Sequence, residues 1–310
     1  MARKTSNRIG KTATDVAEGS RRLAIAIDQQ RQLLRSAAAR LAAAGSGAVH
    51  HGRVAARRMR SLLKTFGPLV DARSDRLLRA DLRSFARSLA STRETDVRRD
   101  LLLGLVRRHQ DVTPADVERL GAMLDECCRE ARDSLGRRAA EPGWSALLDA
   151  IEREATVEYL RLRSDASLAD VLERVDDAWQ KAERQLLREP TAVAELHELR
   201  LALKHFRYAI EPVADLGEAE AAELLVRLRK AQDRIGEHRD TLLAADWVRA
   251  NARALGSRLA PRLLALLARH EQRLRKQAAR RARDVLPAGR RWRRATRRLR
   301  KGTTTGPARR

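Results

Sequence analysis

Apolar residues recur along this chain at steps of three and four, the spacing that returns side chains to one face of an α-helix. The first run covers about residues 14–44, and the second covers residues 49–66 and stops at Gly67-Pro68, a pair that favours a chain break. Further helices are expected at about residues 74–91, from 94, from Pro114 with Thr113 as N-cap, and at 167–188, 196–213, 218–235, 237–254 and 261–284. No convincing strand is present, so the sequence predicts an all-α fold of antiparallel helices.

One helical pattern occurs twice. Residues 49–66, VHHGRVAARRMRSLLKTF, return at an offset of 147 as residues 196–213, LHELRLALKHFRYAIEPV. Each copy carries an apolar stripe beside a cationic stripe. The offset pairs His50 with His197, Arg53 with Arg200, Arg57 with Lys204 and Arg60 with Arg207, while Lys64 meets Glu211. A later pair, Asp96 and Asp240, follows at an offset of 144, so we expect two related bundles, residues 14–142 and 143–285, with a pseudo-twofold relation.

The charge balance points to a polyanionic partner. Lys and Arg number 65 against 41 acids, a formal net charge of +24. Nucleic acid, polyphosphate and an anionic membrane all fit this charge. Arginine outnumbers lysine 57 to 8, which reflects either forked phosphate contacts or codon bias.

The ends of the chain, its longest apolar runs and its cysteines indicate which segments are flexible and where in the cell the protein is expected. Residues 1–13 are expected to form a flexible arm, and residues 286–310, with ten basic residues and no acid, a disordered tail that adds secondary nucleic-acid contact. Trp292 is the only aromatic residue of that tail. No run reaches the roughly 20 apolar residues of a membrane span, and the only cysteines, Cys127 and Cys128, are adjacent, so we expect a soluble, cytoplasmic protein.

The two stripes, with RETDV at residues 93–97 and IGEHRD at residues 235–240, resemble the CHAD family, the conserved histidine α-helical domain, over roughly residues 14–285. The family pattern of a histidine followed by spaced basic residues is met by His50, Arg53, Arg57, Arg58 and Arg60, and again by His197, Arg200, Lys204, Arg207 and Tyr208. Thr92 stands where the family often has glycine, and His205 replaces a more usual basic residue. The resemblance implies two related helical bundles with a basic cleft between them and inorganic polyphosphate as the ligand. Some members carry a CYTH triphosphatase domain, but its Glu-x-Glu-x-Lys signature is missing here.

We therefore expect polyphosphate to contact the basic, histidine and tyrosine side chains of both stripes. These are His50, Arg53, Arg57, Arg58, Arg60, Lys64, His197, Arg200, Lys204, His205, Arg207 and Tyr208. Guanidinium and ammonium groups on two facing helices would hold successive phosphates by charge-assisted hydrogen bonds. Histidines would add charge in acid, so affinity is expected to rise as the pH falls through about 6.5.

Several alternatives remain open from the sequence. The stripes could be solvated helix faces that are basic by chance, or the protein could bind nucleic acid without sequence preference, although only 3% of residues are aromatic and none is spaced for base stacking. It could also coat phosphate-rich granules as a scaffold. A metal-dependent phosphohydrolase centre of His50, His51, His197, Asp96 and Asp240 is disfavoured, because the surrounding arginines repel divalent cations. We expect a non-enzymatic protein without metal or cofactor, associated with polyphosphate granules, in which Asp96 and Asp240 orient nearby arginines.

Overall fold

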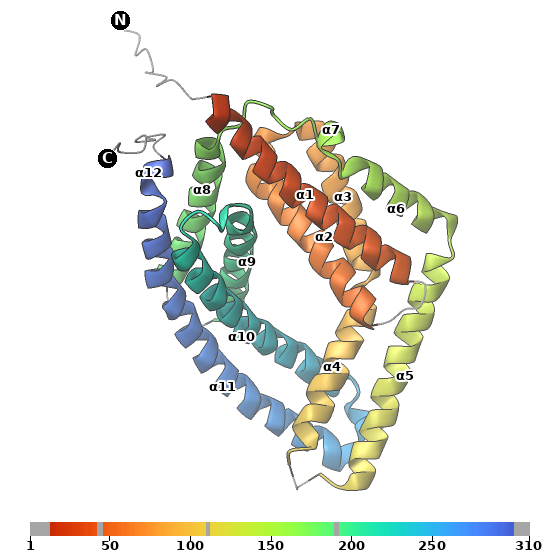
Figure 1. Cartoon of the computed structure of the whole chain (residues 1–310). Coiled ribbons are helices and arrows are strands. Elements are labelled where there is room, and N and C mark those ends of the chain that lie inside the picture. The colour runs from red at the N-terminus through yellow and green to blue at the C-terminus, as the bar shows by residue number, and fades with distance from the viewer. Residues whose placement is uncertain (1–12, 42–45, 110–111, 189–191, 301–310) are drawn as a thin grey trace, which may run out of the picture.

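The structure is a computed structural model that describes residues 13–41, 46–109, 112–188 and 192–300 (Figure 1). Throughout these ranges the regular structure is helical, which confirms the all-α prediction. The elements are α1 (Ala13–Leu41), α2 (Ser46–Phe66), the 3-10 turn η1 (Gly67–Leu69), α3 (Ala72–Ser88), α4 (Ala90–Val106), α5 (Pro114–Ala139), α6 (Pro142–Glu154), α7 (Val157–Leu160), α8 (Leu168–Leu187), α9 (Val193–Ile210), η2 (Glu211–Val213), α10 (Glu218–Ala250), α11 (Ala252–Ala295) and α12 (Arg297–Arg300). Among the helices described, none combines the length and apolar character needed to cross a membrane.

A side-chain cap and a chain break account for two helix ends that the sequence predicts. The hydroxyl of Thr113 accepts a hydrogen bond from the Asp116 amide at 3.2 Å, so Thr113 is the predicted N-cap of α5. Helix α2 ends at Phe66, and Gly67 begins η1 directly after it. The order of two helices, a 3-10 turn and a further helix occurs in α1, α2, η1 and α3 and again in α8, α9, η2 and α10. A rotational relation between the two halves stays a prediction.

The helices that the sequence predicts at residues 218–235 and 237–254 form one continuous helix, α10. The sequence placed a break between residues 235 and 237, but α10 continues through Gly236 to Ala250. A glycine inside a helix lowers its stability by only about 1 kcal/mol. The buried neighbours Ile235 and His238 hold the helix on its packing partners, so tertiary packing outweighs that local preference.

The prediction of a disordered tail from residue 286 is wrong up to residue 300, and residues 301–310 lie outside the described part of the chain. Helix α11 runs through Pro287 to Ala295, and Trp292 is fully buried with its ring 6.2 Å from that of Phe206. A Cβ on Gly289 would come within 2.1 Å of the Trp179 ring, so only glycine permits this close packing. The ten basic residues of this segment and its lack of acids favoured a disordered tail, so the sequence did not reveal the helix.

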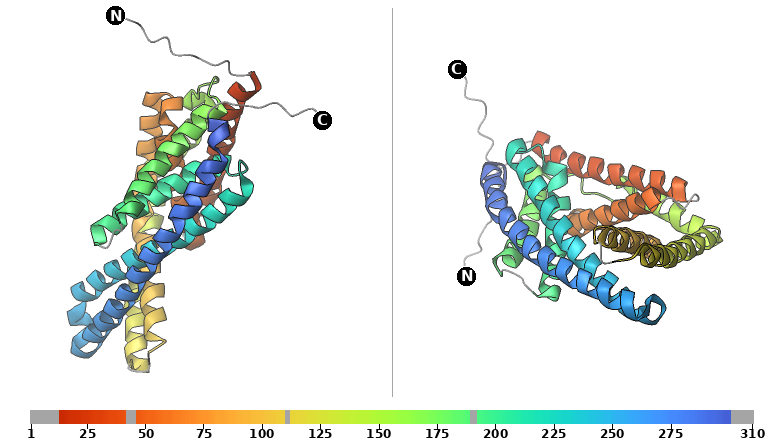
Figure 2. Two further views of the ribbon diagram at one scale, coloured as in Figure 1. Left: turned by 90° about the vertical axis from the view of Figure 1, so that its left-hand side faces the viewer. Right: turned by 90° about the horizontal axis from the view of Figure 1, so that it is seen from below.

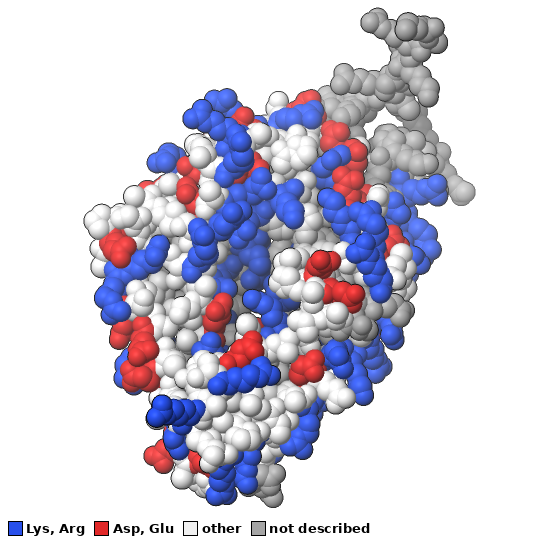
Figure 3. All heavy atoms as spheres, turned by 180° about the vertical axis from the view of Figure 1, so that it is seen from behind, with Lys and Arg blue, Asp and Glu red and all other residues white. Residues whose placement is uncertain are grey.

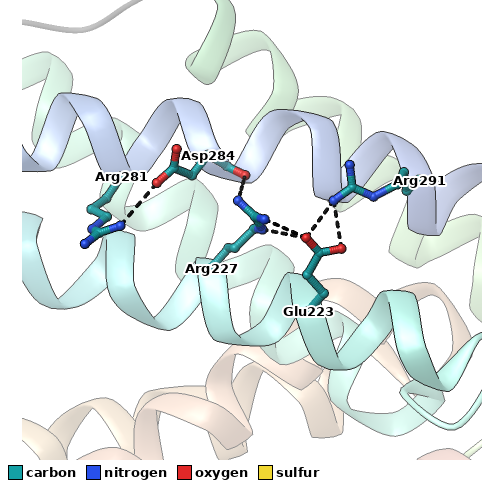
Figure 4. Close-up of polar contacts among 5 residues, drawn as sticks. All are labelled: Glu223, Arg227, Arg281, Asp284 and Arg291. Atoms are coloured by element: carbon teal, nitrogen blue, oxygen red, sulfur yellow. Dashed lines mark hydrogen bonds and ion pairs between the residues drawn. The ribbon is translucent and has the colours of Figure 1, made fainter.

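Ion pairs join the end of α11 to α10 (Figure 4). One Arg291 nitrogen donates to both carboxylate oxygens of Glu223 at 2.7 Å, and Arg227 donates to the same carboxylate at 2.6 and 2.9 Å. Arg227 also reaches the carbonyl oxygen of Asp284 at 3.4 Å. Arg291, near the C-terminal end of α11, therefore has an acidic partner within the fold.

Four helices form a closed ring that positions the candidate site. Helix α2 contacts both α9 and α4, and α10 also contacts both α9 and α4. The α4–α5 pair and the α10–α11 pair extend to the same end of the molecule, where they share an apolar core (Figure 2). Two further cores lie under α1, α2 and α3 and under α8, α9 and α10. The ring thus combines helices from both halves of the chain.

Candidate anion-binding site

Charged side chains from all four helices of the ring interact electrostatically. We call this group the central cluster: His50, Arg53 and Arg57 from α2, Arg93 and Glu94 from α4, Arg200, Lys204 and Tyr208 from α9, and Arg239 and Asp240 from α10. Lys and Arg side chains gather around a hollow in the middle of the rear face of the molecule (Figure 3). The cluster holds six Arg and Lys side chains against two acids, so its charge is strongly positive.

Tyr208 organises the contact between α2 and α9. Its side chain is buried, and its hydroxyl accepts a hydrogen bond from Arg57 Nε at 3.3 Å. The guanidinium groups of Arg58 and Arg207 lie over its ring, 5.6 and 5.1 Å from the centroid. Both arginines also contact Glu211 at 3.5 Å. Arg58 and Arg207 are therefore held by groups of the chain itself, whereas Arg57 belongs to the central cluster.

Two arginines of the cluster have buried N–H groups without a hydrogen-bond partner among the described residues. These are Nη1 of Arg53 and Nε of Arg200. Burial is the main cause that lowers the pKa of both guanidinium groups, and Arg57 adds to it. Arg200 packs on the backbone of Gly236, where a Cβ would lie 3.2 Å from its terminal nitrogen. An unsatisfied buried donor is unfavourable, so an incoming acceptor would gain from both groups.

Lys204 is the most perturbed base of the cluster. Burial lowers its pKa to about 6, and the positive charges of Arg57, Arg200 and Arg239 act in the same direction. Asp240 is the acid that opposes this effect, and burial raises the pKa of Asp240 itself. In the free protein at neutral pH the Lys204 amine is therefore largely uncharged.

Of the predicted site residues, the cluster contains His50, Arg53, Arg57, Arg200, Lys204 and Tyr208. His197 is exposed and borders a pocket of about 420 Å³ that Arg200 and Arg239 also line. Lys64 is exposed farther along α2. Arg60 lies against arginines of α3 instead.

His205 and His50 are less suited to carry charge near neutral pH than expected. His205 lies between α2 and α9, with its ring nitrogens 3.2 Å from the Ser61 hydroxyl and 3.3 Å from that of Thr65. Burial lowers its pKa to about 4, so it stays neutral through pH 6.5. Partial burial and the charge of Arg93 also lower the pKa of His50.

Two basic residues of the cluster, Arg93 and Arg239, were not among the predicted site residues. Arg93 belongs to the segment RETDV and Arg239 to the segment IGEHRD. Both segments contribute to the family resemblance, but their arginines were not predicted to contact the ligand. Asp240 interacts with Arg200 and Arg239, whereas Asp96 pairs with Arg132 of α5 at 2.7 Å. In the part of the chain that the structure describes, no group of three His, Cys, Asp or Glu residues is placed to hold a metal ion.

Comparisons with known proteins bear on the family. The profile of the CHAD domain matches residues 24–249. A solved structure described as PptA from Streptomyces chartreusis superposes with a TM-score of 0.68 at 22% identity, covering 88% of this chain and 99% of that one. The CHAD domain from the plant Ricinus communis superposes with a TM-score of 0.66 at 20% identity, covering 89% and 92%. A search of curated proteins found no match. With a family profile that spans most of its length, the chain belongs to the CHAD family.

Proposed function

We propose that this protein binds inorganic polyphosphate at the central cluster and that it does so without catalysis. One observation carries the proposal: six basic side chains from four helices converge with two acids, and burial together with the neighbouring cations lowers the pKa of Lys204 to about 6. Such an arrangement is unfavourable in the free protein, because like charges repel one another. A bound polyanion would remove this repulsion. Membership of a family associated with polyphosphate supports the same ligand.

The chemistry of the ligand matches the chemistry of the cluster. Polyphosphate presents anionic oxygens at every unit and carries no base or sugar. The guanidinium groups of Arg53 and Arg200 offer unpaired N–H donors, and Lys204 can gain a proton beside an anion. The protein would then be retained on polyphosphate granules in the cytoplasm.

Nucleic acid is the competing ligand, because its backbone attracts the same cations. Proteins that bind single strands usually stack bases on aromatic side chains. The aromatic ring of the cluster, Tyr208, is 2% exposed and covered by arginines. This favours a ligand that consists of phosphate alone.

The test compares two full-length variants in which equal numbers of arginines and lysines are replaced. In the first, Arg53, Arg57, Arg200 and Lys204 of the cluster are changed to alanine. In the second, three exposed arginines and one exposed lysine of α11 are changed to alanine: Arg253, Arg258, Lys276 and Arg280. The full chain is needed because α11 continues to Ala295 with Trp292 in the core.

Binding of medium-length polyphosphate is measured at 0.15 M salt with DNA as competitor. We expect the cluster variant to lose affinity by about a hundredfold or more, since several charge-assisted contacts disappear together, and the α11 variant to lose only a few-fold. Equal loss in both variants, or easy displacement by DNA, would show that overall charge explains the attraction.

A further inference from the structure

Arg60 belongs to the cationic stripe of α2 but lies outside the central cluster. Its guanidinium is partly buried and is surrounded by the charges of Arg79, Arg83 and Arg87 on α3. Burial and these three neighbours lower the pKa of Arg60. Four arginines from two adjacent helices therefore form a second concentration of positive charge, which we call the α3 track: Arg60, Arg79, Arg83 and Arg87.

The three arginines of α3 follow one another at four-residue steps. This spacing places them on one face of the helix, over a length of about 12 Å. Arg83 and Arg87 are exposed, and the described part of the chain provides neither with an ion-pair partner. Arg79 pairs with the buried Asp75. Like charges at this spacing repel one another in a helix, so the track is unfavourable in the absence of an anion.

The α3 track is continuous with the central cluster. Arg60 follows Arg53 by seven residues on α2, a distance of about 10 Å along the helix axis. Helix α2 contacts both α3 and α4, so its cations adjoin the arginines of α3 at one end and Arg93 at the other. On the rear face of the molecule, Lys and Arg side chains form a band that reaches the central hollow (Figure 3).

We propose that the α3 track is an accessory subsite for the part of a polyphosphate chain that extends beyond the central cluster, and that it makes affinity depend on chain length. The inference rests on the proposed function of the cluster. A short chain is accommodated by the cluster alone. A longer chain leaves the hollow along α2 and places its phosphates on Arg60, Arg83 and Arg87.

The test uses full-length protein and charge-matched double variants. Arg83→Gln with Arg87→Gln removes two exposed arginines of the track and leaves the Arg79–Asp75 pair intact. Arg253→Gln with Arg258→Gln removes two exposed arginines of α11. Each protein is titrated with tripolyphosphate and with a chain of several tens of phosphates over a series of salt concentrations.

We expect all three proteins to bind tripolyphosphate alike. For the long chain, the track variant should bind about threefold to tenfold more weakly than the α11 variant, as expected for two exposed charge contacts. For the track variant, the slope of log affinity against log salt concentration should be smaller in magnitude by about 1 to 2, because fewer counterions are displaced.

Two results would overturn the subsite. Equal weakening of long-chain binding in both variants would assign the effect to overall charge, and equal weakening of both ligands by the track variant would remove the dependence on chain length. Failure of the unmodified protein to bind either ligand would instead refute the proposed function, and the subsite with it.

Discussion

Lys204 is a buried base whose charge depends on its ligand. With a pKa of about 6, set first by burial and then by Arg57, Arg200 and Arg239, it is mostly neutral at pH 7.5. An unfolded chain would hold the proton up to a pH of about 10.4, so the free protein gains stability as the pH rises above about 6. A bound phosphate reverses this balance by supplying negative charge next to the amine.

Polyphosphate binding should therefore be accompanied by proton uptake at Lys204. Affinity is expected to fall as the pH rises above about 6, because binding then requires the amine to take up a proton. Calorimetry at pH 7.5 in buffers of different ionisation enthalpy should show uptake approaching one proton for each bound chain. Lys204→Arg keeps the charge and should abolish the uptake, since arginine stays protonated. Unchanged uptake in this variant would assign the proton to another group, with His50 as the first candidate.

Gly236 affects the site through its lack of a side chain. An added Cβ would meet the Arg200 guanidinium at 3.2 Å, so Gly236→Ala should displace that group and lower polyphosphate affinity by a few-fold. Helix propensity favours alanine by up to about 1 kcal/mol, so the free energy of unfolding should stay level or rise. Gly121→Ala in α5, where nothing lies within 4 Å, should stabilise without any effect on binding. Equal affinity in the two variants would mean that the position of Arg200 does not matter.

At the scale of elements, the second half of α11 completes a core. Trp292 packs on Phe206, which in turn lies with its ring 5.1 Å from that of Trp179. Phe206 is on α9 beside Lys204 and Arg207, so this core supports the helix that presents the second stripe. Arg291 and Arg293 of the same segment pair with Glu223 and Asp176 and thus stabilise the fold.

Trp292→Ala should lower the free energy of unfolding by about 3–5 kcal/mol, the range for removing a large buried aromatic side chain. Denaturant unfolding measures this directly. Trp247→Ala, which removes a partly buried ring beneath Arg98, should have a smaller effect. A chain that ends at residue 285 and unfolds with undiminished stability would contradict the role assigned to α11.

On the scale of the whole molecule, the site belongs to neither half alone. The ring of α2, α4, α9 and α10 joins elements from both halves, and repulsion among the five arginines of the central cluster opposes their close approach. A polyanion in the centre would remove that repulsion and connect the helices through a common ligand.

Polyphosphate should consequently stabilise the entire fold. At a free concentration of a hundred times Kd, the gain is about 2.7 kcal/mol, which a thermal-unfolding experiment registers as a rise in Tm. Amide hydrogen exchange should slow in the ring helices α2, α4, α9 and α10. The variant with Arg53, Arg57, Arg200 and Lys204 changed to alanine should show neither effect; if it responds equally, the ligand stabilises through other surfaces.

The sequence by itself determined the helical class, most helix ends and the stripe residues that reach the cluster, because these follow from a local period of 3.6 residues and from a pattern that occurs twice. Arg53, Arg57, Arg200 and Lys204 could be named in advance for that reason. Tertiary structure alone decided which other helices meet the stripes. It places Arg93 and Arg239 in the central cluster and directs His205 toward Ser61 and Thr65. It also places Arg60 against α3 and buries Trp292. Such outcomes depend on packing between segments far apart in the chain, which no local pattern records.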